Sequence, residues 1–422
     1  MEFFNVITPD GFVELLAGFP RLAGEAVPLD GALGRRLAGE VAAREDLPEG
    51  ARSTVDGYAV RAEDTFGASD AIPALLKLAP AVTMGTVPGF KLAPGHAAPI
   101  PTGGFLPQGA DAVVMVEYAN PAGAGAIEVS RPVTLRTNVL GRGEDARAGE
   151  ALLGAGKLLR AQEIGFLAAL GVAEVEAFRR PRVAIVSSGD EVVPVGREPR
   201  PGQVRDANGH ALAALVRDAG GEPVAFDIVP DDAAALDRTL RAALDAADVV
   251  AISGGSSVGA RDLMASAVAA LPGAEVLAHG VAIRPGKPTL LGRCGGGAGH
   301  AVFGLPGHPV SALVVAQVFL APFLRHLQGA PLRKGPEGRE VAAALASSLH
   351  STIGLEEYVR VRLERADVGP GGARGDGETP TAHPVWGKSG MLSTLVRADG
   401  VVRVPMNAEG LARGAAVPVI LY

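Results

Sequence analysis

The chain has 422 residues, of which 48% are hydrophobic and only 4% aromatic, and its formal net charge is −7. At roughly 100–200 residues per domain, this length predicts two to four domains, with cores filled mainly by Ala, Val and Leu. The net negative charge argues against a protein that coats nucleic acid, because such proteins are normally basic. The single cysteine, Cys294, excludes an intrachain disulfide and a cysteine-based metal cluster.

The sequence gives no sign of a membrane protein. Residues 1–12 contain Glu2 and Asp10 and lack the basic region and apolar core of a signal peptide. The most apolar helix candidate runs from Val310 to Leu324, about 15 residues, which is too short to span a bilayer. We therefore expect a cytoplasmic protein that binds neither a membrane nor nucleic acid.

The predicted secondary structure changes twice within the first 178 residues, from helix to strand and back to helix. Residues 1–47, including 32–41, have a helical pattern, and helix is predicted again at 161–170. Between them, short strands at 57–60, 81–84 and 112–116 are separated by Pro and Gly turns. We infer that 1–47 and 143–178 form one discontinuous helical dimerisation domain, into which a β-rich domain, 48–142, is inserted.

Residues 179–327 alternate between strand and helix patterns. This alternation predicts an α/β domain with a mostly parallel sheet covered by helices. Strands are expected at 183–186, 224–229, 249–252, 289–291 and 301–303, and helices at 211–219, 232–247, 263–271 and 310–324. Asp231 is placed to cap the helix at 232–247. Residues 331–422 return to a β pattern and predict a C-terminal β domain.

In open α/β sheets, ligands bind beyond the carboxyl ends of the strands, and four unusual loops occur at such ends. The first is Ser187-Ser188-Gly189-Asp190-Glu191. A glycine lets backbone N–H groups face a ligand, hydroxyls bind oxyanions, and two adjacent acids can hold Mg²⁺. A turn with solvated acids is the alternative interpretation.

The second loop is Ser253-Gly254-Gly255-Ser256-Ser257-Val258-Gly259, with Asp262 three residues further on. A Gly/Ser loop that opens a helix presents several N–H donors at the positive end of the helix dipole, which favours an anion. The loop lacks the Lys of a P-loop and the spacing of a dinucleotide-binding fingerprint. A flexible loop without a ligand is the alternative.

The third and fourth loops add cations and a helix N-terminus. In Arg284-Pro285-Gly286-Lys287-Pro288, two phosphate-binding cations flank a rigid turn, although an exposed basic turn would look the same. The segment Gly304–Ser311 contains Pro306 and His308 and opens the last helix with Pro309. His308 is either a proton donor or a residue that caps the helix or faces solvent.

Together the four loops predict a pocket for an extended anionic ligand with a metal ion, and hence a phosphate-handling α/β enzyme. Two further segments, around Asp56 and around Thr102, are turns by composition alone.

At these positions the sequence resembles the MoeA-type molybdopterin molybdenumtransferases, a family that includes the E domain of gephyrin. The resemblance covers nearly the whole chain in the right order. The matching pieces are Gly34–Pro48, Ser53–Val60, Ile100–Gly104, Ser187–Glu191, Ser253–Gly259, Ile283–Pro288, Gly304–Ser311 and Gly387–Leu392.

The resemblance implies an elongated homodimer of four domains. Its α/β domain would be similar to the MogA-type adenylyltransferase that acts one step earlier, and its C-terminal domain would be barrel-like. The expected reaction takes adenylylated molybdopterin and molybdate and, with Mg²⁺, releases AMP. The expected cleft lies between the α/β domain of one subunit and the inserted domain of the other. Transient contacts with the adenylyltransferase and with molybdoenzyme chaperones are also expected.

The resemblance also assigns roles to residues. Asp56 and Thr102 would be catalytic residues supplied by the partner subunit, and Glu191, Asp231 and Asp262 would be catalytic acids that bind the metal. Pterin and phosphate would be bound by Ser187, Gly189, Asp190, Ser253, Gly254, Gly255, Ser256, Ser257, Gly259, Arg284, Pro285, Gly286, Lys287, Pro306, His308 and Ser311.

The chain departs from the family pattern at five positions. Ser253 and Ser256 replace Thr and Val, Arg284 replaces Lys, His308 replaces Asn, and Gly280 stands where the family has a further Lys. Three alternative functions remain open: the adenylyltransferase step, a non-catalytic cofactor carrier, and a tungstate-handling paralogue. AMP release, ATP consumption and pterin binding would discriminate the first two from molybdate insertion.

Overall fold

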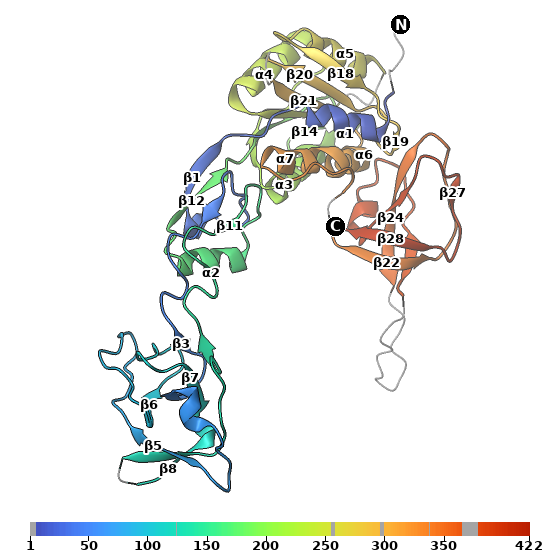
Figure 1. Cartoon of the computed structure of the whole chain (residues 1–422). Helices are drawn as coiled ribbons and strands as arrows, with labels where there is room; N and C mark the ends of the chain where they lie inside the picture. The colour runs from blue at the N-terminus through green and yellow to red at the C-terminus, as the bar shows by residue number, and fades with distance from the viewer. Residues whose placement is uncertain (1–5, 124, 255–257, 296–298, 337, 365–378) are drawn as a thin grey trace.

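The computed structural model describes residues 6–123, 125–254, 258–295, 299–336, 338–364 and 379–422, and the side chains of 258–262 are also outside the description. The chain forms an elongated arrangement of units (Figure 1). The α/β domain and the C-terminal β domain lie side by side at one end. The discontinuous domain lies between the α/β domain and the inserted β-rich domain, which is at the other end.

Helix α1, Pro9–Ala17, belongs to the α/β domain rather than to the discontinuous domain in which the sequence placed it. Thr8 caps it by accepting a 3.1 Å hydrogen bond from the Gly11 N–H. Phe12 and Leu16 are fully buried, and the rings of Phe12 and Phe319 lie 4.5 Å apart. The apolar face that predicted a helix is therefore covered by the helical stretch 309–327.

The discontinuous domain begins at strand β1, Gly24–Pro28, which pairs antiparallel with β12, Glu174–Phe178. One hydrophobic cluster draws on both segments of the chain, including Leu37 and Leu167. The remaining elements are η1 Leu29–Gly31, β2 Val41–Ala42, β11 Ala151–Leu153 and α2 Ala161–Ala169. The prediction of α2 is confirmed, but the predicted helix at 32–41 is wrong, because turns and short β pairings occupy that segment.

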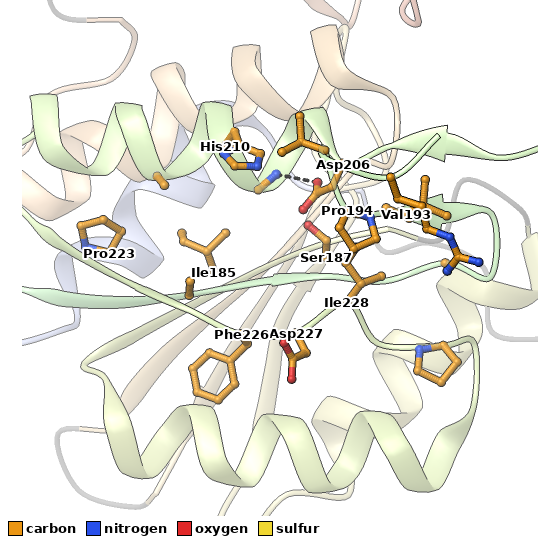
Figure 2. Close-up of a pocket in the computed structure, with 18 of the residues that line it drawn as sticks. Ile185, Ser187, Val193, Pro194, Asp206, His210, Pro223, Phe226, Asp227 and Ile228 are labelled. Carbon is orange, nitrogen blue, oxygen red and sulfur yellow. Dashed lines mark hydrogen bonds between the residues drawn. The ribbon is translucent and has the colours of Figure 1, made fainter. Parts of the chain in front are cut away.

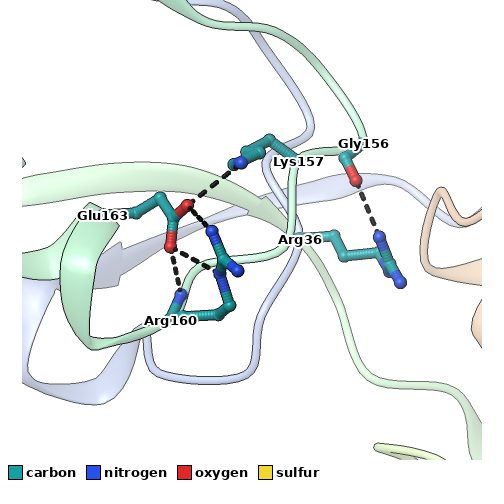
Figure 3. Close-up of polar contacts among 5 residues, drawn as sticks. All are labelled: Arg36, Gly156, Lys157, Arg160 and Glu163. Atoms are coloured by element: carbon teal, nitrogen blue, oxygen red, sulfur yellow. Dashed lines mark hydrogen bonds and ion pairs between the residues drawn. The ribbon is translucent and has the colours of Figure 1, made fainter. Parts of the chain in front are cut away.

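A buried carboxylate organises the start of α2 (Figure 3). The Glu163 side chain accepts hydrogen bonds from the Arg160 backbone N–H at 3.0 Å and guanidinium at 2.7 Å, and forms a 3.0 Å ion pair with Lys157. The Arg160 guanidinium first, and then Lys157, hold the pKa of Glu163 well below its usual range.

We expect Glu163→Gln to lower Tm by a few degrees at pH 7, because it removes two charge-assisted contacts. A depressed pKa stabilises the fold above the unfolded-state pKa and is lost as pH falls toward the folded-state value. The Tm difference from the natural protein should therefore shrink as the pH is lowered below about 4. Thermal melts between pH 7 and pH 3 measure this, with the exposed Glu174→Gln as control. A pH-independent difference would contradict it.

The inserted domain is built on a six-stranded sheet of order β7-β4-β6-β5-β9-β8. The chain enters this domain through β3, Arg52–Ser53, and leaves it through β10, Val139–Leu140, and these two strands pair with each other. The sheet strands are β4 Gly57–Val60, β5 Ala74–Leu78, β6 His96–Ile100, β7 Ala112–Met115, β8 Ala119–Pro121 and β9 Ala126–Val129, with turns η2 Ala62–Thr65 and η3 Val116–Tyr118. The predicted strand at 81–84 is wrong, since this segment lies between β5 and β6 as a loop.

The α/β domain has a six-stranded sheet of order β16-β13-β17-β21-β20-β18, as predicted mostly parallel. The first four strands run parallel, and β20 is antiparallel to both of its neighbours, β21 and β18. The strands are β13 Arg182–Ser187, β16 Glu222–Ala225, β17 Val249–Ser253, β18 Glu275–His279, β20 Leu290–Cys294 and β21 His300–Leu305, with the side pair β14 Val192–Val193 and β15 Val204–Arg205. The covering helices are α3 Ala207–Asp218, α4 Ala233–Ala246 and α5 Val258–Ala269.

The last helical stretch of the α/β domain combines α6 Pro309–Val315, η4 Ala316–Leu320 and α7 Ala321–Leu327. Together they make 19 helical residues, longer than the helix predicted from the sequence. By length and composition this helix passes the test for a membrane span, and 78% of its most apolar window is buried inside the fold. It packs against the sheet and α1 as the centre of the largest hydrophobic cluster.

The C-terminal domain is a closed five-stranded barrel, which confirms the barrel-like domain that the resemblance implied. Its strands follow the ring β24-β25-β22-β28-β26, which closes because β26 pairs back with β24. The ring strands are β22 Glu340–Leu345, β24 Glu356–Glu364, β25 Thr381–Pro384, β26 Gly400–Val404 and β28 Ala416–Leu421, with β23 Leu349–His350, β27 Gly410–Leu411 and α8 Ser393–Val396 outside it. Strand β19, Ile283–Arg284, comes from the α/β domain and pairs parallel with β24, which joins the two domains.

Candidate functional site

Three of the four predicted loops leave the sheet at the same level. In the parallel register, Ser187 of β13 lies beside Ser253 of β17, and Ser253 lies beside Leu305 of β21. The chain runs from β13 to β16 at the edge of the sheet and then crosses back to β17 on the opposite side of β13. The strand order therefore reverses between β13 and β17. Such a reversal opens a crevice beyond the carboxyl ends of the strands, and the first two loops flank it.

The first two loops are also in direct contact. The Ser188 N–H donates to the Ser253 carbonyl oxygen at 2.9 Å. A Cβ on residue 254 would lie 2.1 Å from the Ser188 hydroxyl oxygen, so only glycine permits this crossing. Gly255, Ser256 and Ser257 lie outside the described residues. Gly259 and Asp262 belong to helix α5, and the positions of their side chains are likewise outside the description.

Acidic side chains gather at the end of β13. The Asp231 N–H donates to a carboxylate oxygen of Asp190 at 3.2 Å. Partial burial, followed by the charges of Asp190 and Glu191, raises the pKa of Asp231. The prediction that Asp231 caps α4 is wrong, because Asp232 is the N-cap and accepts from the Ala235 N–H at 2.7 Å. Asp231 is therefore left to face the acidic loop.

The predicted metal ligands are only partly assembled. In the described part of the chain, no three His, Cys, Asp or Glu side chains are grouped closely enough to hold a metal ion. Glu191 and Asp231 are near enough for their charges to interact, whereas the Asp262 side chain is not described. One or two carboxylates with substrate phosphates and water are the usual ligands of Mg²⁺, and this pair fits that pattern.

The second, third and fourth loops meet at a narrow crevice of about 10 Å³ lined by Gly254, Pro288 and Pro306. Gly280, which stands where the family has a lysine, lies just before this region with φ 112°. This backbone conformation favours glycine, so a residue with a side chain would be strained at position 280.

A second, basic cavity of about 550 Å³ lies between the α/β domain and the barrel. Arg284, Lys287 and Ser311 line it from the α/β domain, and Arg360 and Ser389 line it from the C-terminal domain. Arg360 is 9% exposed, and its Nε atom has no hydrogen-bond partner among the described residues. Burial lowers the pKa of Arg360 from its ordinary value. An unpartnered buried N–H is the kind of donor that an oxyanion satisfies.

The pairing of β19 with β24 builds this basic cavity, since Ile283 lies beside Glu356 in the register. A second set of contacts between the two domains involves Ser389. The Val310 N–H donates to the Ser389 carbonyl oxygen at 3.0 Å, and the Ser389 hydroxyl lies 3.0 Å from Nδ1 of His308. His308 is exposed at the N-cap of α6 but makes no side-chain cap. Sequence reasoning missed Arg360, because a single arginine in a strand of another domain carries no local signal.

Asp56 and Thr102 are brought together in the inserted domain. One carboxylate oxygen of Asp56 accepts from the Thr102 N–H at 2.7 Å and from its hydroxyl at 2.9 Å. The backbone bond first, and the hydroxyl second, lower the pKa of Asp56. Within one protomer this pair is separated from the sheet loops by the discontinuous domain (Figure 1).

These features define a class: a multidomain α/β protein with Gly- and Ser-rich loops at the carboxyl edge of its parallel strands and a basic cavity shared with a C-terminal barrel. Three family models match successive parts of the chain. They are the MoeA N-terminal region (domains I and II) at residues 9–171, a probable molybdopterin binding domain at 184–326, and the MoeA C-terminal region (domain IV) at 342–422.

Relatives match almost the whole length. A molybdopterin molybdenumtransferase from Nostoc sp. is 36% identical over 94% of this chain and 88% of its own, and molybdopterin molybdenumtransferase 2 from Mycobacterium tuberculosis is 36% identical over 93% and 94%. A molybdopterin biosynthesis MoeA protein from Pyrococcus horikoshii superposes with a TM-score of 0.84 at 30% identity, covering 99% of this chain and 100% of that chain. The chain belongs to the MoeA-type molybdopterin molybdenumtransferase family and so to molybdenum cofactor biosynthesis.

Proposed function

We propose that this protein inserts molybdate into adenylylated molybdopterin and releases AMP, as a Mg²⁺-dependent cytoplasmic homodimer. The observation that carries the proposal is the basic cavity, because Arg284, Lys287 and Arg360 place three cations there against the single carboxylate of Glu357, which lies 3.8 Å from Arg284. Ser311 and Ser389 add hydroxyl donors in the same cavity. Related proteins named molybdopterin molybdenumtransferases support the substrate classes.

The loops at β13 and β17 would hold the phosphoanhydride of the substrate. Hydroxyls and backbone N–H groups at Ser187 and Ser253 favour phosphate oxygens at the sheet edge. When bound, Mg²⁺ would stabilise negative charge on the phosphates as the anhydride breaks. The chain's own contribution is to orient the anhydride and to hold the oxyanion in the adjoining basic cavity.

We expect Asp231→Asn to weaken the binding of Mg²⁺. Partial burial, followed by the charges of two neighbouring acids, raises the pKa of Asp231, and a divalent cation relieves the repulsion between these acids. The variant should need about tenfold more Mg²⁺ for half-maximal AMP release, consistent with the loss of one carboxylate contact. The adjacent Asp232→Asn variant is the control, because Asn also caps helices well. Equal Mg²⁺ titrations for both variants would remove Asp231 from the metal site.

The homodimer is proposed to complete the site. Asp56 and Thr102 form an ordered pair, yet the discontinuous domain separates them from the sheet loops of their own protomer. A second copy in the homodimer that the resemblance implies would bring this pair to the other protomer's loops. Mixing an Asp56→Ala protein with an Asp262→Ala protein should restore part of the activity that each lacks alone.

The decisive test is to incubate the purified protein with adenylylated molybdopterin and Mg²⁺, with and without molybdate, and to measure AMP release. Molybdate-dependent release is the expected result. Binding of the pterin without any release would overturn the proposal in favour of a cofactor carrier, and consumption of ATP without molybdate would favour the adenylyltransferase step. Tungstate in place of molybdate tests the choice of oxyanion.

A further inference from the structure

A cavity of about 300 Å³ lies apart from the candidate site. Two larger cavities adjoin that site: the basic cavity, and a cavity of about 770 Å³ beside the first loop, with Ser187, Asp206 and Phe226 in its wall (Figure 2). The latter opens because β16 ends at Ala225, whereas a strand was predicted as far as residue 229. Among the described residues, none that lines the 300 Å³ cavity belongs to the four loops.

This cavity, here named the junction cavity, lies between the α/β domain and the barrel. Helix α3 and the helical stretch 309–327 line it from the α/β domain, and Leu421 and Tyr422 line it from the barrel. In Figure 1 the C-terminus of the chain marks this place between the two domains. Ligand pockets are common at domain interfaces and have volumes of about 300–1,000 Å³, so the junction cavity has the size for one small ring compound.

A proline shapes the wall of the junction cavity. Pro322 lacks the N–H that would bond to the Val318 carbonyl oxygen one turn earlier. The helix is widened before it, since the Ala321 N–H donates to the carbonyl oxygen five residues back and forms the turn η4. The Val318 carbonyl oxygen accepts instead from the Gly335 N–H, at 3.3 Å, in the connection between the two domains.

The widened turn carries an unpartnered acceptor. Gln317 of η4 is half-buried and lines the junction cavity. Its side-chain oxygen, Oε1, is buried and has no hydrogen-bond partner among the described residues. Burial of an amide oxygen without a partner is unfavourable. Its complement is therefore a ligand that donates one hydrogen bond.

The rest of the wall favours an uncharged ligand. Leu215, Leu313 and Leu421 supply aliphatic surface. Two charged residues also line the cavity, Asp218 and Arg325, and their side chains form an ion pair with each other at 3.5 Å. A charged ligand would bring a further charge to an apolar wall whose own charges already neutralise each other, which is unfavourable.

The end of β28 connects the junction cavity to the basic cavity. Leu421 pairs with Gly400 of β26, and Gly400 pairs with Val361, the residue after Arg360 on β24. Partial burial raises the pKa of the Tyr422 hydroxyl to about 12, and the charge of Arg360 opposes this shift. Tyr422 lines the junction cavity and Arg360 lines the basic cavity, so a ligand beside Tyr422 acts close to the buried cation.

We propose that the junction cavity is an effector site for a small uncharged ring compound whose single N–H or O–H group donates to Gln317. A bound ligand contacts both domains and holds them together, and the same two domains enclose the basic cavity. Occupancy therefore makes the basic cavity more rigid and strengthens its binding of an oxyanion. Binding of the ring compound is independent of the proposed function, whereas the effect on the oxyanion rests on it.

The first test compares indole with benzothiophene, which has a similar size and shape but lacks the N–H donor. Ligand-observed NMR titration of the natural protein should give an affinity about tenfold higher for indole, as expected for one hydrogen bond to a buried acceptor. Gln317→Met should remove this preference by weakening indole while benzothiophene still binds. Equal affinities in the natural protein, or no binding of indole, would overturn the proposal.

A filled cavity provides the second test. Ala214 of α3 is exposed and lines the junction cavity, so a Trp side chain there occupies it without burying new surface in the core. Ala214→Trp should lose at least tenfold in affinity for both probes. Ala234→Trp is the matched control, because Ala234 is an exposed alanine of α4 outside the junction cavity. If Ala214→Trp binds indole as the natural protein does, indole binds elsewhere and the proposal fails.

The effector role is tested by molybdate titration with and without saturating indole. We expect the molybdate affinity of the natural protein to rise about fivefold with indole, and that of Ala214→Trp to stay unchanged. Indole binding without any change in molybdate affinity would overturn the effector role. If the protein binds no molybdate under either condition, the proposed function fails and the effector role with it, whereas the comparison of indole with benzothiophene still decides whether the junction cavity is a ligand site.

Discussion

Arg360→Met is expected to raise the molybdate KM for AMP release by about two orders of magnitude. Hydrogen bonds to charged groups contribute about 1.5–3 kcal/mol, and this change also removes a cation from a buried site. Arg360 is the buried cation of the basic cavity, and its unpartnered Nε faces no protein acceptor among the described residues. Molybdate titrations of AMP release measure the effect.

Two further variants define what Arg360 contributes. Arg360→Lys should fall between the natural protein and Arg360→Met, because it keeps the charge but loses the planar donor geometry. Arg362→Met is the matched control, since Arg362 is exposed on the same strand. If Arg360→Met and Arg362→Met have the same molybdate KM, the basic cavity is not the oxyanion site.

Lys334→Met is expected to lower the free energy of unfolding by about 3 kcal/mol, because it leaves a buried carboxylate without its main counter-charge. The Lys334 ammonium lies 2.8 Å from Asp10 of α1 and 3.0 Å from Glu356 of β24. Glu356 is 2% exposed and also accepts a 2.6 Å hydrogen bond from the Tyr358 hydroxyl. The charged group therefore joins three segments of the chain at one buried point.

Urea denaturation measures the Lys334 effect. The exposed Arg333→Met variant is its control, and its stability should match that of the natural protein. Adding Glu356→Gln to Lys334→Met should recover part of the loss, because the uncompensated buried charge is then removed. No recovery in the double variant would show that Lys334 acts through packing rather than through charge.

Local pattern was enough to predict the α/β domain. The continuous apolar runs at Val183–Val186 and Val249–Ile252 indicated buried parallel strands, and these are β13 and β17. The pattern failed where tertiary contacts decide. The segment 32–41 has helical spacing but pairs with chain more than a hundred residues away, and α1 finds its partner at Phe319. No local signal specifies either contact.

The candidate site was likewise predicted in part. The sequence located the loops at Ser187, Ser253 and Gly304, because strand ends and small residues are visible in a sequence. It did not locate Arg360, which reaches the site only because β19 leaves its own domain to pair with β24. It also misplaced the helix cap by one residue, since Asp231 and Asp232 are chemically equivalent and only the backbone decides which one caps α4.

The docking of α1 has a consequence for how the protein is made. Phe12 and its partner Phe319 are about 300 residues apart, so the ribosome must add two other units and the rest of the α/β domain before the groove for α1 exists. During that interval the apolar face of α1 has no native place to bury itself. Synthesis therefore exposes an amphipathic N-terminal helix for many seconds, and folding of the nascent chain should depend on chaperones that shield such helices.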